Sequence, residues 1–236
     1  MPTSRTKDYR FLLGGPSSLV EITNILGASI SGDAEITNEA FLNQANEAAS
    51  VHSVSESVSI SSMFDSAATD MVVNTFLSSG DLSGVDASLM LVVFQTREGL
   101  VTWQGWPVSF GRPGFAAPPS DSITMPWELM QNGRGGFGTT VVALDLSDGT
   151  AATILGSSVS RPADPVLFLA LTEVDSSVSE VSVEDGSAEV TPDHEISLTR
   201  HSLSSVSQSL TITLSGGGGK GWAFVGSAQA LAADAS

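Results

Sequence analysis

The sequence of 236 residues predicts a mainly β fold, and three observations support this prediction. Apolar and polar residues alternate in segments such as 207–214, SQSLTITL, which is the period of a strand with one buried face. Two uninterrupted apolar runs, Leu89–Phe94 and Val166–Leu171, are typical of strands buried on both faces. Turn signals such as Asp185-Gly186 separate the segments. Many short strands with frequent turns favour a sandwich or a barrel.

Further strands and two helical segments follow from the same analysis. A short helix is predicted over residues 69–80, where apolar residues have helical spacing, Thr69 can cap the first turn and Gly80 can end the last one. Residues 38–50 are predicted to form either a helix, which is slightly favoured, or a long mobile loop. The remaining alternating or β-branched segments predict strands at Val20–Ile25, Val54–Ile60, Leu100–Phe110, Ile123–Trp127, Thr139–Leu144 and Val178–Val183.

Composition divides the chain into four parts. Small, polar and proline-containing residues at 151–164 predict a linker. Before it, residues 19–150 are expected to form a β domain with the short flanking helix. After it, residues 165–236 are expected to form a small β-sandwich. Residues 1–18 precede the first predicted strand and are expected to be an N-terminal arm.

The charge of the chain limits its possible partners. The formal net charge is −17, because 26 acidic residues face only 9 basic ones. Such a surface repels nucleic-acid phosphates, since sequence-independent binding needs many Lys and Arg contacts. The longest apolar runs are too short to span a membrane, and the N-terminal residues lack a signal-peptide core. A protein made in the cytoplasm with no membrane partner is therefore expected.

Residues 215–222, SGGGGKGW, raise the question of a phosphate-binding loop. Such a loop needs a glycine at the position of Leu214 and a Ser or Thr after Lys220, where Gly221 stands instead. Trp222 and Phe224 then alternate as in a strand, so the glycines are predicted to form the open turn of a hairpin. A second cluster, GRGGFG at 133–138, lacks the dinucleotide-binding spacing as well.

No other motif predicts catalysis, a cofactor or a metal. The histidines lack zinc-helix spacing, because His194 and His201 are seven residues apart, and a satisfied or surface histidine is favoured. No nucleophile elbow or EF-hand loop occurs. The acidic residues between Asp175 and Glu189 are expected to be a solvated face, with loose calcium binding as the alternative. Only two carboxylates brought together in space would revive an enzymatic role.

Three tryptophans have two possible roles. Trp103, Trp106 and Trp127 lie close in sequence, and the odd separation of the first two puts them on opposite faces of a strand. Positions in the core or at a subunit interface are favoured, because large aromatic residues dominate both. An exposed platform for sugars is the alternative.

The order of elements over about residues 19–140 resembles the tail tube proteins, or major tail proteins, of long-tailed bacteriophages. The stretch carries strands, a flanking helix, and the pattern Asp121, Ile123, Leu129, Gly133. The C-terminal part resembles the small immunoglobulin-like domains that some of these proteins display. The resemblance implies a virion protein without catalytic residues or cofactors, made in the host cytoplasm and located in the tail.

The resemblance also implies a mode of assembly. Subunits would form stacked rings, hexameric by family expectation, around an acidic lumen through which genomic DNA passes without specific binding. Their partners would be copies of the chain and other tail proteins. Phe41 and Leu42 would belong to an arm that contacts the next ring, and a core-covering helix is the alternative. A capsid decoration protein or a carbohydrate-binding β-sandwich is the rival function.

Overall fold

A computed structural model describes residues 9–14, 19–23, 25–39, 48–63, 85–95, 102–110, 124–131, 133–147, 151–191 and 198–229. Within these residues every regular element is a strand, and no helix long and apolar enough to cross a bilayer occurs. The strands are β1 (Tyr9–Gly14), β2 (Leu19–Glu21), β3 (Ile25–Glu39), β4 (Ala48–Met63), β5 (Val85–Gln95), β6 (Trp103–Phe110), β7 (Thr124–Gln131), β8 (Gly136–Asp145), β9 (Ala151–Leu155), β10 (Pro165–Val174), β11 (Glu180–Asp185), β12 (Ala188–Thr191), β13 (Leu198–Ser202), β14 (Leu210–Ser215) and β15 (Gly219–Ala228).

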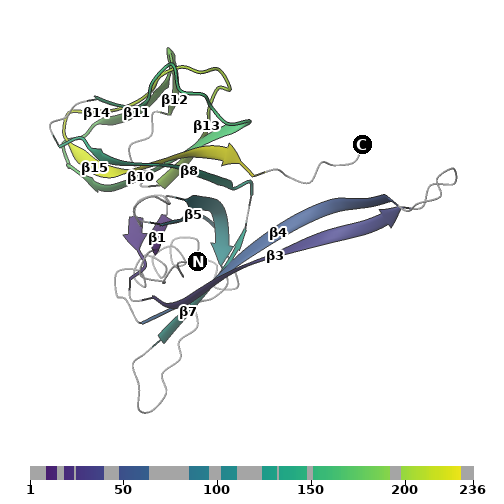
Figure 1. Cartoon of the computed structure of the whole chain (residues 1–236). Helices are drawn as coiled ribbons and strands as arrows, with labels where there is room; N and C mark the ends of the chain where they lie inside the picture. Colours follow the sequence, from purple (N-terminus) through teal and green to yellow (C-terminus); the bar gives the residue numbers. More distant parts are fainter. Residues whose placement is uncertain are drawn as a thin grey trace, which may run out of the picture.

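The strands form two antiparallel sheets, and the mainly β prediction is confirmed. A sheet of 11 strands runs β13-β10-β15-β8-β6-β5-β1-β2, and β7, β4 and β3 continue from β6 as a branch. A sheet of 4 strands, β12-β11-β14-β9, covers one end of the large sheet and makes a sandwich with it (Figure 1). The rest of the large sheet curls into a half-barrel below the sandwich (Figure 1).

Strand β10 explains how the layers are joined, because both of its faces are buried. Leu167, Leu169 and Leu171 point into the sandwich core with apolar residues of β11 and β14. Val166, Phe168 and Ala170 point the other way, into a second core shared with the half-barrel. Strand β5 divides its side chains in the same way between this second core and a third one inside the half-barrel. Both continuous apolar runs are therefore strands buried on two faces, as predicted.

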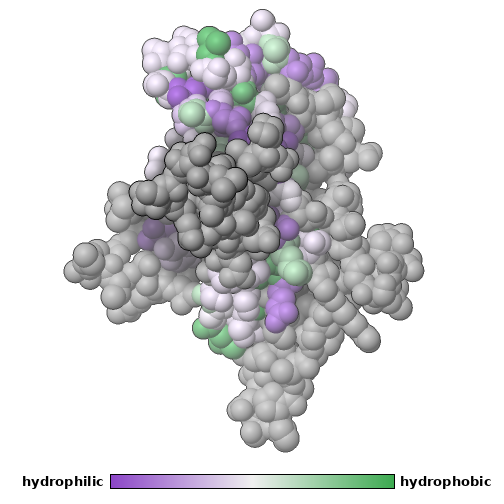
Figure 2. Space-filling view, turned by 90° about the vertical axis from the view of Figure 1, so that its right-hand side faces the viewer, coloured by the Kyte–Doolittle hydropathy of each residue, from purple (hydrophilic) through white to green (hydrophobic). Residues whose placement is uncertain are grey.

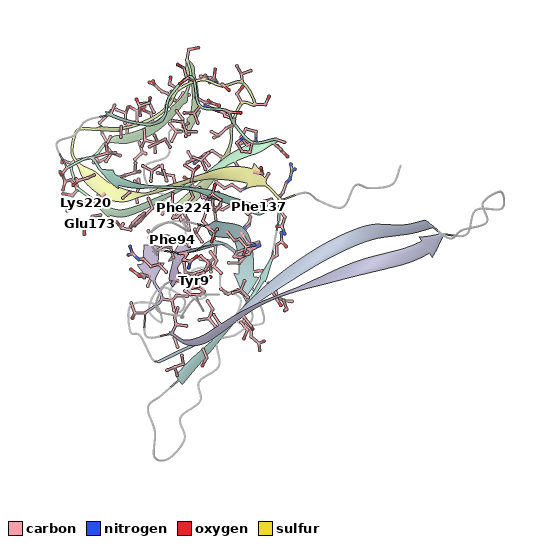
Figure 3. All side chains as sticks on the ribbon, in the orientation of Figure 1. Tyr9, Phe94, Phe137, Glu173, Lys220 and Phe224 are labelled. Atoms are coloured by element: carbon pink, nitrogen blue, oxygen red, sulfur yellow. The ribbon has the colours of Figure 1, made fainter. Side chains whose placement is uncertain are left out.

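The second core is an aromatic cluster between the two halves of the molecule. The ring centroids of Trp103 and Phe168 lie 5.3 Å apart, and those of Phe94 and Phe224 lie 5.0 Å apart. Figure 3 labels Phe94 and Phe224 on either side of this junction. Trp103 also satisfies its buried indole N–H by donating it to the carbonyl of Val225 at 3.2 Å. The cluster ties the sandwich to the half-barrel.

Glycines allow the strands at this junction to approach so closely. Strands β6 and β8 pair only over Trp103–Gly105 and Gly136–Gly138. A Cβ atom on Gly105 would lie 2.9 Å from the Phe168 ring, and one on Gly138 would lie 2.8 Å from the Trp103 indole nitrogen. Any side chain there would displace the aromatic rings. The cluster GRGGFG is thus a packing feature, consistent with its failure to match a nucleotide-binding motif.

The loop between β14 and β15 overturns the predicted hairpin. The strands do not pair with each other, because β14 lies in the small sheet and β15 in the large one. The glycines carry the chain across the edge of the sandwich, and Gly216 has a φ of +89°. Gly218 donates its N–H to the Asp175 carboxylate at 2.8 Å, and Gly219 exchanges backbone hydrogen bonds with Leu146. Alternation shows that two segments are strands but not that they are neighbours.

The structure also changes the predicted boundaries. Residues 9–14 form β1 between β2 and β5, so part of the predicted arm is a strand of the large sheet. Residues 151–155 of the predicted linker form β9, which pairs with β14. Strand β8 pairs with β15 and belongs to the sandwich. Residues 38–39 and 48–50 extend β3 and β4, so the helix predicted over 38–50 is wrong at both ends. The helix predicted over 69–80 lies outside the described residues.

Replacing Gly218 by Ala should destabilise the fold by about 1–3 kcal/mol. The added Cβ would lie 2.5 Å from the carbonyl oxygen of Ser147, which is backbone and cannot move aside without shifting the strand ends. Gly156→Ala is the matched control, because a Cβ there meets nothing within 4 Å. Urea denaturation measures both variants. Equal stability of the two would show that the loop is only a connector.

Candidate assembly surface

The longest strands of the protein form a hairpin that leaves the body. Strands β3 and β4 pair from Ile25 with Ser62 to Glu39 with Ala48. In Figure 1 this hairpin projects far beyond the half-barrel. At its base β4 also pairs with β7, but only over Ser57–Met63. Beyond Ser57 the hairpin is a ribbon of two strands with no third strand on either edge among the described residues.

A ribbon of this kind is marginally stable in water by itself. Both of its edges carry backbone N–H and C=O groups that no other strand of the described chain uses. Exposed strand edges also favour pairing with another chain. A long ribbon is therefore a physically reasonable element only where another surface covers it, and that makes it a candidate assembly element.

The base of the hairpin has a buried and an exposed face. Val58, Ile60 and Leu129 point inward and are 1–2% exposed in the half-barrel core. The opposite face is formed by exposed serines, and we call it the serine face: Ser29, Ser31, Ser57, Ser59 and Ser61, with Glu128 beside them on β7. The hydroxyls of Ser31 and Ser57 lie 2.8 Å apart across the pair. Alternation in SVSESVSISS thus separates a hydroxyl surface from the core.

The charges on these strands all have one sign. The sequences of β3, β4 and β7 contain no Lys or Arg. They contain five acidic residues, Asp33, Glu35, Glu39, Glu56 and Glu128. Strands with acidic residues and no Lys or Arg in their sequences offer phosphate groups no attraction.

Two exposed apolar side chains lie beside the serine face. Leu26 is 59% exposed, because the register of β3 and β4 shifts between Ile25 and Gly27 and this bulge turns Leu26 outward. Met130, at the end of β7, is 60% exposed. In Figure 2 the described surface over the half-barrel carries green apolar residues beside hydrophilic ones, whereas the sandwich above is mostly white and purple.

The predicted aromatic site residues lie in different places. Trp103 and Trp106 are 1% and 2% exposed and belong to two different cores. Neither indole is available to stack on a sugar. Trp127 lies in β7 and pairs with Ile60, but its side chain is outside the described part of the structure. Phe41 and Leu42 also lie outside the described residues, between the ends of β3 and β4.

Most of the described cations are already paired with carboxylates. Arg10 binds Glu21, Arg134 binds Asp164 and Lys220 binds Glu173. Arg10 also lies over the Phe94 and Trp222 rings, at 5.6 and 5.2 Å from their centroids. These pairs leave few positive groups to offset the excess of acids on the described surface.

The fourth pair is buried in the sandwich. Arg161 and Asp185 lie 2.7 Å apart with side chains 0% and 3% exposed. Arg161 also donates to the carbonyls of Ser204 and Gln208, while its Nε is buried without a hydrogen-bond partner. Burial alone would raise the pKa of Asp185, but hydrogen bonds from Arg161, Ser204 and Gln208 outweigh it and lower the pKa. No local sequence pattern predicts this pair, because its members are 24 positions apart.

The structure offers no metal or histidine chemistry in its described part. No group of three His, Asp or Glu residues there is arranged to hold a metal ion. His201 contacts the hydroxyl of Thr199 at 2.6 Å, and burial together with the nearby Arg200 lowers its pKa to about 4. His201 is therefore neutral at pH 7. His194 lies outside the described residues.

Comparisons with known proteins give similar structures only. No protein-family model and no curated protein matches the chain. A chain from the tail of an empty gene transfer agent particle is similar with 15% identity and a TM-score of 0.41, covering 58% of this chain and 99% of its own. A chain from the baseplate of the anti-feeding prophage has 13% identity and a TM-score of 0.40, covering 57% and 97%.

The Dit protein of phage SPP1, described as part of a hub adsorption apparatus, covers 94% of this chain and 99% of its own. Its identity is 9% and its TM-score is 0.32. At these identities and TM-scores the likeness carries no argument about function. Function has to be argued from the surfaces of this chain.

Replacing Asp185 by Asn should cost about 3–5 kcal/mol at pH 7, because it leaves the Arg161 guanidinium buried without its counter-charge. Asp164→Asn is the matched control. Asp164 is 54% exposed beside Arg134, and an exposed pair contributes at most about 1 kcal/mol. Urea denaturation of both variants measures the difference, and equal losses would contradict the argument.

The same pair predicts a pH dependence. Because the pKa of Asp185 is lowered in the folded state, its contribution is fully present above the ordinary Asp pKa of about 3.9 and is lost as the pH falls below that value. The stability difference between the parent and Asp185→Asn should therefore shrink as the pH falls below about 4.

Proposed function

We propose that this chain is a structural subunit of a bacteriophage tail tube, which self-assembles into stacked rings and catalyses no reaction. The observation that carries the proposal is the β3–β4 hairpin, whose distal part has no partner within the described chain. A stacked ring supplies that partner in the form of a neighbouring copy. Hexameric rings are the expectation from the family resemblance.

Ring formation needs one patch of a subunit to meet a different patch of the next. The hairpin supplies one patch, because it reaches away from the body and exposes strand edges. Leu26 and Met130 at its base supply exposed apolar area for the complementary contact. Phe41 and Leu42, between the ends of the two strands, are proposed to contact the adjacent ring.

We propose that the serine face lines the lumen. DNA passing through a tube must not adhere to the wall, and a wall of hydroxyls and carboxylates without cations meets that need. Genomic DNA therefore passes without specific binding. The sandwich, with its own core on the other side of the aromatic cluster, is proposed to lie on the exterior as an immunoglobulin-like domain.

The proposed location is the tail of the virion, after synthesis in the host cytoplasm, with other tail proteins as further partners. A capsid decoration protein is the alternative. It would bind preformed capsids and would have no use for a ribbon that pairs with successive copies. The buried positions of Trp103 and Trp106 remove the observation that first favoured a sugar-binding role.

Shortening the hairpin should abolish assembly and spare the fold. Residues 33–55 are replaced by Asn-Gly, which joins the directly paired Gly32 and Glu56 by a two-residue turn. The pairing of β4 with β7 starts at Ser57 and stays intact. Negative-stain electron microscopy of the concentrated parent should show rings or tubes. The shortened chain should remain monomeric with an unchanged unfolding transition.

A double substitution tests the hairpin tip separately. Phe41→Ser/Leu42→Ser should weaken stacking of rings, and Val206→Ser is the control, because Val206 is 64% exposed on the sandwich. A parent that stays monomeric, or that binds capsids instead, would overturn the tube proposal. Tubes that form equally well from the shortened chain would overturn the role of the hairpin.

The lumen assignment has its own test, because the chain contains no cysteine. Ser59→Cys puts one thiol on the serine face, and Thr153→Cys puts one on the exposed surface of β9. Both thiols should react with a maleimide carrying a 5-kDa polymer in the monomer, where 5 kDa is roughly one fifth of the chain mass. In assembled tubes only Cys at 153 should react. Equal reaction at both positions in tubes would show that the serine face lies outside.

A further inference from the structure

A groove runs between the sandwich and the half-barrel, at the point where β6 and β8 separate. Its volume is about 1100 Å³. Thr139 and Thr140 of β8 and the loop Val159–Pro162 line it from the sandwich, and Tyr9 of β1 lines it from the half-barrel. Figure 3 labels Tyr9 and Phe137 in these two halves. The volume lies at the upper end of the range for small-molecule sites, so the groove suits a large ligand.

The groove is electrically neutral in a strongly acidic chain. Arg161 is the one charged residue among the described side chains that line it. Its guanidinium is fully buried and is already used by Asp185 and by two backbone carbonyls. No charge is left to select an ionic ligand, and the net charge of −17 disfavours anions. The chemistry of the groove therefore favours an uncharged ligand.

The lining combines apolar surface with neutral hydrogen-bonding groups. Phe137 and Val159 are 50% and 42% exposed, and both line the groove. An exposed phenyl ring offers an apolar face that costs free energy while it faces water. Hydroxyl and amide side chains lie around it: Thr102, Gln104, Thr139, Thr140, Ser160 and Ser227.

We infer that this groove binds a neutral oligosaccharide. Sugar rings present apolar C–H faces, which stack on an aromatic ring such as Phe137, and hydroxyl groups, which exchange hydrogen bonds with Thr, Ser and Gln side chains. Such a ligand matches the neutral lining and the large volume. The stacking surface is Phe137 and not the buried Trp103, which also lines the groove. The site is available in the monomer, so it goes beyond the assembly role and stands or falls separately from it.

The test uses the soluble full chain and a panel of neutral hexasaccharides: maltohexaose, cellohexaose, mannohexaose and chitohexaose. Isothermal titration calorimetry should detect saturable binding of at least one of them. Phe137→Ala should weaken that binding about tenfold, because it removes the stacking surface. Val206→Ala, another exposed apolar position, should leave it unchanged. Thermal unfolding of both variants verifies that they are folded.

Several outcomes would overturn the inference. Binding of none of the four sugars at millimolar concentration would do so, as would equal binding by Phe137→Ala and the parent. Tighter binding of an anionic hexauronate than of the neutral sugars would contradict the argument from charge.

Residues 139–145 of β8 have no strand on the side away from β15 among the described residues. The last test adds an excess of a peptide made of valine and threonine. If this peptide displaces the bound sugar and binds with equal or higher affinity, the groove is a strand-docking site instead.

Discussion

The aromatic cluster between the sandwich and the half-barrel is the contact on which the rest of the structure depends. Phe94 and Trp103 come from one half, and Phe168 and Phe224 come from the other. Their rings can meet because Gly105 of β6 and Gly136 and Gly138 of β8 carry no side chain where these strands pair. This close contact fixes the angle between the halves, and it leaves the groove on one side of the junction. Packing at the junction therefore sets both the shape of the subunit and its most distinct cavity.

The half-barrel and the sandwich differ in how fully internal contacts use their backbone N–H and C=O groups. In the sandwich, loops are held in place by the buried Arg161–Asp185 ion pair and by the hydrogen bond from the Gly218 N–H to the Asp175 carboxylate. The half-barrel instead continues into a ribbon whose edges end in solvent. Buried apolar contacts are thus concentrated in the cores, while the longest unpaired strand edges among the described residues belong to one projecting element. That separation is what a subunit needs if it folds first and then assembles.

The charged groups are also unevenly distributed over the molecule. Four of the five described cations are held by carboxylates, so the acidic excess is left on exposed surface. The strands of the projecting hairpin and β7 contain acidic residues but no Lys or Arg. The groove carries almost no charge. One chain therefore presents a surface that repels phosphates and, in a different place, a neutral surface suited to sugars.

The sequence by itself determined most of the strands, but not β1, β9, β12 or β13, because alternating side chains indicate which segments have one buried face. It identified the doubly buried runs around Val92 and Phe168, and it excluded a phosphate-binding role for the glycines before Lys220. The tertiary structure alone decided which strands are neighbours. It placed β1 in the large sheet between β2 and β5, β9 in the sandwich, and β14 and β15 in opposite sheets. Strand pairing joins residues far apart in the chain, such as Trp103 and Gly138. The local sequence pattern around one residue does not indicate which residue it pairs with.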